Sequence, residues 1–118
     1  MDDEIKKWIE QAEEDLNTAK YNLDGGKLGA GVFFLQQSSE KALKAVYIKK
    51  FEDLLKTHDL VLLAKKLKAP DEIIEFCKEL TPAYQYARYP DVPKMENINV
   101  PKLIKYSEEI LKWAKKTI

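Results

Sequence analysis

One arginine and one histidine carry the chemistry that this sequence offers. Arg88 is the only arginine beside nineteen lysines, and it lies in the stretch TPAYQYARYPDVPK. Its planar guanidinium can grip a phosphate or a carboxylate in two places, which a lysine ammonium cannot do. His58 is the only histidine, so no metal site built from several histidines exists. The question is what a guanidinium does at a position where lysine does not suffice.

Two interpretations of Arg88 remain open. The guanidinium either holds a phosphate or locks the following loop by pairing with Asp91. The neighbouring tyrosines, Tyr84, Tyr86 and Tyr89, either pack around the end of a helix or form a platform for stacked bases. His58 and Asp59 have a plain alternative as residues of a helix first turn, where a carboxylate complements the helix dipole.

Apolar residues recur at three- and four-residue steps, which predicts helices. The predicted helices span residues 3–23, 29–51, 58–68 after Thr57 as N-cap, 71 to the proline at 90, and 100–118 after Asn99 as cap. Pro82 interrupts the fourth pattern, and the continuing spacing favours a kinked helix over a new one. No strand-like alternation occurs. The sequence therefore predicts one all-α domain over 1–118, an antiparallel up-and-down bundle of four to five helices.

The second predicted helix is apolar on more than one face, which indicates a central position or burial against a partner. Its surplus apolar surface, alone or with the first predicted helix beside it, is the predicted dimer face. Glu40 and Lys44 stand four residues apart in the favourable order and are expected to pair on its solvent face. Cys77, the only cysteine, lies among apolar residues and is expected to be a buried thiol.

Alternating helix directions would place the starts of the first, third and fifth helices at the end where the second and fourth finish. That end would gather Lys56, His58, Asp59, Arg88 and Asp91. Helix N-termini present unpaired N–H groups and a positive dipole end, which suit an anion.

Composition limits the function classes. Charged residues make up 34% of the chain and the formal net charge is zero, which argues against binding of nucleic acid or membrane through bulk charge. No apolar run is long enough for a bilayer and no signal peptide is present, so we expect a cytoplasmic protein without membrane contact. Plentiful Lys and Glu with scarce Gln and Asn lean toward a thermophile. No Gly-rich phosphate loop, Ser/His/Asp arrangement or Cys–His pair is found, and we expect no cofactor and no metal.

Four stretches together resemble one family. WIEQAEEDLNTAKYNL, FFLQQSSEKALKAVYI, KTHDLVLLAKKL and YQYARYPDV are similar, in this order and spacing, to the HEPN family (higher eukaryote and prokaryote nucleotide-binding domains), in its small RYPD-containing prokaryotic and archaeal branch. The resemblance covers nearly the whole chain. It implies a homodimeric bundle of four or five helices that associates with nucleotides or RNA. It also implies a minimal nucleotidyltransferase partner and a place in toxin–antitoxin pairs.

Catalytic members of that family are metal-independent endoribonucleases with an arginine followed, after four to six residues, by a histidine. Arg88 matches the arginine, but the histidine positions are occupied by Pro93, Lys94 and Met95. The RYPD form resembles the branch of binding modules instead.

We therefore predict a homodimer that binds a nucleotide or another phosphate ligand, or a nucleotidyltransferase partner. The predicted ligand-binding residues are Arg88, His58, Asp59, Lys56, Asp91, Tyr84 and Tyr89. The alternatives are an endoribonuclease toxin that uses Arg88 with His58, and a dimeric scaffold without a small ligand.

Overall fold

The computed structural model describes residues 2–88 and 98–118, with the backbone alone for Tyr84 and residues 86–88. The chain folds into five helices, α1 (Asp2–Asp24), α2 (Leu28–Phe51), α3 (Leu60–Lys66), α4 (Asp71–Arg88) and α5 (Val100–Thr117). The described residues contain no strand, and the predicted all-α class is confirmed.

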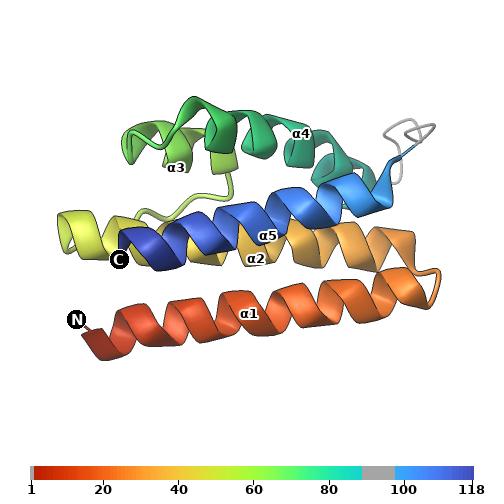
Figure 1. The fold of residues 1–118 in the computed structure, drawn as a ribbon, viewed down its shortest axis with the longest axis horizontal. Helices are drawn as coiled ribbons and strands as arrows, with labels where there is room; N and C mark the ends of the chain where they lie inside the picture. Colours follow the sequence, from red (N-terminus) through yellow and green to blue (C-terminus); the bar gives the residue numbers. More distant parts are fainter. Residues whose placement is uncertain (1, 89–97) are drawn as a thin grey trace.

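The four long helices form an up-and-down bundle, and α3 lies in the connection between α2 and α4 (Figure 1). α1 and α2 make one antiparallel hairpin, and α4 and α5 make a second (Figure 1). Two ion pairs join α1 to α5: Lys20 Nζ lies 2.9 Å from Glu108 Oε2, and Lys115 Nζ lies 3.3 Å from Glu13 Oε2. The residue order in these pairs shows that α5 runs antiparallel to α1.

α3 breaks the strict alternation that the sequence predicted. Gln36 Nε2 donates to the carbonyl oxygen of His58 just before α3, at 3.0 Å, and Lys50 Nζ donates to that of Leu67 just after it, at 3.2 Å. α3 therefore runs in the same direction as α2. As a result α1 and α5 begin at opposite ends of the bundle (Figure 1). The prediction that the first, third and fifth helices start at one end is wrong.

The reason lies in the connection between α2 and α3. The C-cap of α2 is Glu52, whose φ of 52° is left-handed. Residues 53–59 then return along α2 as far as Gln36. The N-cap of α3 is Asp59, whose Oδ1 accepts from the Leu62 amide at 3.0 Å. Thr57, the predicted cap, instead accepts from the Asp59 amide at 3.1 Å. α3 consequently has seven residues.

α2 is the centre of the molecule and packs against all four other helices. Small polar residues let neighbours approach it: Ser38 Oγ donates to the Ala12 carbonyl of α1 at 2.7 Å, and the Ser39 and Ser107 hydroxyls lie 3.1 Å apart across the contact with α5. The predicted central position is confirmed. Because this chain itself covers most of the apolar residues of α2, they no longer argue for a dimer face on that helix.

The course of α4 through Pro82 and the cap of α5 follow the predicted pattern, while the predicted end of α4 at Pro90 lies outside the described residues. α4 continues through Pro82, and Thr81 Oγ1 donates to the Cys77 carbonyl at 2.9 Å instead of capping a new helix. Asn99 caps α5 through its Oδ1, which accepts from the Lys102 amide at 3.1 Å.

Among the described helices, none has the length and apolar character needed to cross a membrane.

Candidate functional site

A cavity with both polar and apolar lining residues lies between the start of α3 and one face of α4. Its volume is about 550 Å³, and its lining consists of His58, Asp59, Val61, Lys78, Thr81, Pro82 and Gln85. The four α4 residues recur at helical spacing, so they share one face of that helix. The Lys78 ammonium, the Gln85 amide and a protonated His58 imidazole can donate hydrogen bonds to an anion, whereas the Thr81 hydroxyl donates to the Cys77 carbonyl.

His58 is held in this cavity by a buried carboxylate of α2. Its Nδ1 lies 2.9 Å from Glu40 Oε1; the Glu40 side chain is only 4% exposed, whereas that of His58 is 66% exposed. The backbone is held as well, since Gln36 donates to the His58 carbonyl. Two contacts from successive turns of α2 therefore fix the position and the orientation of this residue.

The carboxylate of Glu40 belongs to a longer buried network. Its Oε2 accepts from Lys44 Nζ at 2.8 Å, and the Lys44 side chain is 9% exposed. The same ammonium lies 5.9 Å from the centroid of the Trp8 ring on α1, in cation–π range. The predicted Glu40–Lys44 pair is thus present, but the prediction that it lies on the solvent face is wrong. The network connects α1, α2 and His58 in the segment before α3.

Asp59 contributes a negative charge at the edge of the cavity. Its carboxylate caps α3, which accounts for its orientation. Burial, and second the charge of Asp59, raises the pKa of the Cys77 thiol on α4 to about 12. Cys77 is fully buried and remains a neutral thiol at neutral pH, so it is not a nucleophile of this site.

The structure places the predicted site residues unevenly. His58 and Asp59 line the cavity, whereas Lys56 is exposed and stands outside its described lining. Arg88 ends α4 three residues after Gln85, so its backbone continues the face that borders the cavity. Tyr84 lies within α4. Tyr89 and Asp91 lie outside the described residues.

Sequence reasoning missed several residues of the site. Lys78, Thr81 and Gln85 precede Arg88 at steps of three and four, and extending the helix pattern backwards from the arginine would have found them. No local signal identifies Glu40 as the partner of His58. That contact depends on the return of residues 53–59 along α2.

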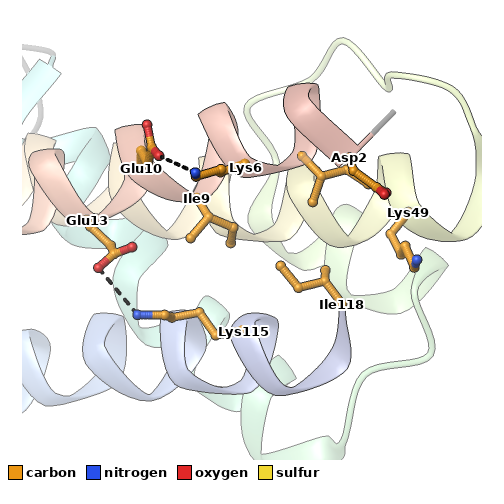
Figure 2. A pocket seen from close by; sticks show the side chains of 9 residues that line it. Asp2, Lys6, Ile9, Glu10, Glu13, Lys49, Lys115 and Ile118 are labelled. Carbon is orange, nitrogen blue, oxygen red and sulfur yellow. Dashed lines mark hydrogen bonds and ion pairs between the residues drawn. The ribbon is translucent and has the colours of Figure 1, made fainter.

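A second cavity lies at the end of the bundle that holds both chain termini, between α1, the end of α2 and the end of α5 (Figure 2). Its volume is about 420 Å³, and Ile5, Ile9 and Ile118 form an apolar floor. At its rim Lys6 Nζ lies 4.0 Å from Glu10 Oε1, and Lys115 Nζ lies 3.3 Å from Glu13 Oε2 (Figure 2). Because its floor is apolar and three carboxylates, those of Asp2, Glu10 and Glu13, line it, this cavity suits a phosphate less well than the one at His58, which one carboxylate lines.

The ammonium in the first cavity also has a carboxylate partner. Lys78 Nζ lies 3.2 Å from Glu75 Oε1 in an exposed pair, and such pairs contribute little free energy in water. An incoming phosphate can therefore compete for this ammonium.

Within the described part of the chain, no group of three His, Cys, Asp or Glu side chains could hold a metal ion.

The fold and the site define the class of this protein: an all-α bundle with a central second helix and a cavity beside the fourth. A family model for the HEPN domain matches residues 5–117, and the chain belongs to that family. The fold is similar to that in the crystal structure of TT1696 from Thermus thermophilus, with a TM-score of 0.87 and 23% identity over 97% of this chain and 98% of the other. It is also similar to that of ST0689, described as an archaeal HEPN homologue, with a TM-score of 0.77 and 28% identity over 95% of both chains. No curated protein matches the chain significantly in sequence.

Proposed function

We propose that this HEPN-domain protein is a homodimeric binding module that takes a phosphate-containing ligand, such as a nucleotide, in the cavity between His58 and α4. The observation that supports this most directly is the pair of donors on one face of α4. Lys78 and Gln85 border the cavity, and the backbone of α4 continues to Arg88 three residues further on. A phosphate needs such donors around it, together with positive charge.

Calorimetric titration with ATP and with a short RNA tests the proposal. Lys78→Ala and Arg88→Ala should each raise the Kd by about tenfold or more, because a hydrogen bond to a charged group contributes about 1.5–3 kcal/mol. Lys7→Ala is the matched control, since it removes the same charge from α1, which does not contact α4. Absence of heat with every ligand at high protein concentration would end the phosphate part of the proposal.

Arg88→Lys separates the two interpretations of this residue. A guanidinium that grips a phosphate loses its two-point geometry in the lysine variant, so the Kd rises although the charge is kept. A guanidinium that only locks the chain by pairing with Asp91 leaves the Kd unchanged and lowers the Tm instead. Measuring both quantities on the same samples therefore decides between the roles.

The homodimer and the nucleotidyltransferase partner are proposed from the resemblance to the HEPN family, and light scattering and co-purification test them separately. A molar mass of twice the 13.7 kDa chain is expected at micromolar concentration. A strict monomer would remove the dimer from the proposal and leave the phosphate site standing. A nucleotidyltransferase that binds as well to the Arg88→Ala variant as to the wild type would show that it uses another surface.

A second candidate function is a metal-independent endoribonuclease that uses His58 with Arg88. The contact between Glu40 and His58 favours it, because a carboxylate on one ring nitrogen orients the other for general acid–base work. Incubation of the purified protein with cellular RNA tests this function beside His58→Ala. Equal cleavage in both samples would identify a contaminant.

A further inference from the structure

We infer that Glu40 is a positioning residue that couples phosphate binding in the His58 cavity to the uptake of one proton by His58. This inference rests on the proposed function. It adds a regulation, since the protein would bind its ligand more tightly as the pH falls. The following steps use only the contacts of the residues around the imidazole.

The first step concerns the free protein. An ionised carboxylate accepts hydrogen bonds and cannot donate them. Glu40 also accepts from the Lys44 ammonium, so both of its oxygens act as acceptors. Its Oε1 therefore requires a proton on His58 Nδ1, 2.9 Å away. In a neutral imidazole only one nitrogen carries a proton, so Nε2 is then an unprotonated acceptor.

The second step concerns the ligand. Nε2 is the ring nitrogen that Glu40 does not contact, and among the side chains that the structure describes it has no hydrogen-bond partner. The ring borders the cavity over α4. A phosphate oxygen is an acceptor, and it repels an unprotonated nitrogen. A phosphate that reaches Nε2 is therefore bound well only after Nε2 takes a proton from the buffer. No covalent bond to the ligand is formed.

Some of the charged groups around the ring stabilise its protonated form, and others destabilise it. From α2, Glu40 stabilises an imidazolium and Lys44 opposes it. From α4, Lys78 opposes it, and from its own segment Asp59 favours it. The bound phosphate places two or more negative charges beside the ring. These charges stabilise the protonated ring relative to the neutral one.

NMR on the wild-type protein tests the positioning without any ligand. His58 is the only histidine, so labelled imidazole nitrogens give signals that need no assignment. Above the pH at which the ring loses its charge, we expect Nδ1 to be protonated and Nε2 to be unprotonated. The opposite tautomer would overturn the role of Glu40.

Glu40→Gln should reverse the tautomer. The amide oxygen of the variant is expected to take the Lys44 ammonium, which leaves its NH₂ group to donate to Nδ1. The proton of the neutral ring then moves to Nε2. Glu13→Gln, the same change in a carboxylate of α1 that pairs with Lys115, should leave the tautomer unchanged. A purely structural contribution of Glu40 predicts no reversal.

Calorimetry with ATP at pH 8 tests the coupling, because the ATP phosphates are already deprotonated there. In two buffers with different ionisation enthalpies, the measured enthalpies should differ by up to about one proton per ATP bound. The Kd should rise by up to about tenfold for each pH unit above 8. His58→Gln keeps a donor for Glu40 but does not titrate, and it should bind ATP with equal enthalpies in both buffers. If Glu40→Gln fails to fold, His58→Gln still tests the coupling.

The outcomes separate the two proposals. Wild-type binding of ATP with the same enthalpy in both buffers overturns the coupling and leaves the phosphate site in place. Proton uptake that persists in His58→Gln overturns the assignment to this residue. No ATP binding in any buffer overturns the proposed function, and the coupling with it.

Discussion

At the scale of single residues, Glu40 decides the character of the site. It is almost fully buried and contacts both the Lys44 ammonium and the His58 ring. Removing two charges from water costs several kcal/mol per ion, and the attraction within the pair returns that cost only when both partners are present. The pair is therefore better suited to fixing the geometry of His58 than to adding stability.

This view predicts a specific pattern of unfolding free energies. Glu40→Leu and Lys44→Met each leave one uncompensated buried charge, and each should lower the free energy of unfolding by about 3–5 kcal/mol. The double variant removes both charges and should be close to the wild type. Urea unfolding of the four proteins measures these values. Additive losses in the double variant would contradict the argument.

The buried thiol of Cys77 makes the second prediction at this scale. Its pKa is about 12 in the folded protein against 9.0 for an ordinary cysteine. Between these values the unfolded chain releases the proton and the folded chain keeps it. The free energy of unfolding should therefore fall as the pH rises from about 9 to 12, by up to ~1.4 kcal/mol per pH unit from this group.

Cys77→Ala isolates that contribution, because lysines and tyrosines titrate equally in both proteins. The stability difference between the wild type and the variant should shrink or change sign between about pH 8 and pH 10.5 in urea unfolding. Parallel pH profiles of the two proteins would show that the thiol does not ionise differently in the two states.

At the scale of the elements, local pattern predicted the long helices well. Apolar spacing and the cap residue Asn99 placed their bounds close to those observed, because both signals act within a few residues. α3 was predicted too long and in the wrong direction. Its course depends on Gln36 and Glu40 holding His58 from two turns of α2, and this contact between segments distant in sequence leaves no periodic signal.

Two glycines near the start of α2 offer a matched pair of substitutions. A Cβ on Gly31 would overlap Cγ and Cδ2 of Leu23 on α1, whereas one on Gly29 meets nothing within 4 Å. Gly31→Ala should lower the free energy of unfolding by about 1–3 kcal/mol through overpacking. Gly29→Ala should raise it by about 0.4–1 kcal/mol, because it restricts the unfolded chain.

The opposite signs form the test, since both changes add one methyl group to the same helix within a single turn. Thermal or urea unfolding of the two variants beside the wild type is sufficient. Equal effects of the two substitutions would mean that α1 and α2 do not approach each other closely at Gly31.

At the scale of the whole molecule, the site spans a stable and a weakly held part. α2 contacts every other helix, and its residues from Ala42 to Val46 are all buried. α3 has only seven residues, of which Leu60, Leu63 and Ala64 are buried, and the connection before it is largely exposed. Among the described helices α3 packs against α2 and α4 alone, and local opening requires less free energy where fewer contacts are broken. The imidazole thus lies on the weakly held part, while the carboxylate that orients it lies in the centre.

Hydrogen exchange should resolve this difference. Amides at the centre of α2 should exchange only through global unfolding, while those of α3 should exchange through a local opening with a lower free energy. His58→Ala removes the contact with Glu40 and should accelerate exchange in α3 without affecting the centre of α2. Ligand bound in the cavity should slow exchange in α3, because it bridges that segment to α4. Exchange of α3 at the rate of global unfolding would show instead that the bundle opens as one unit.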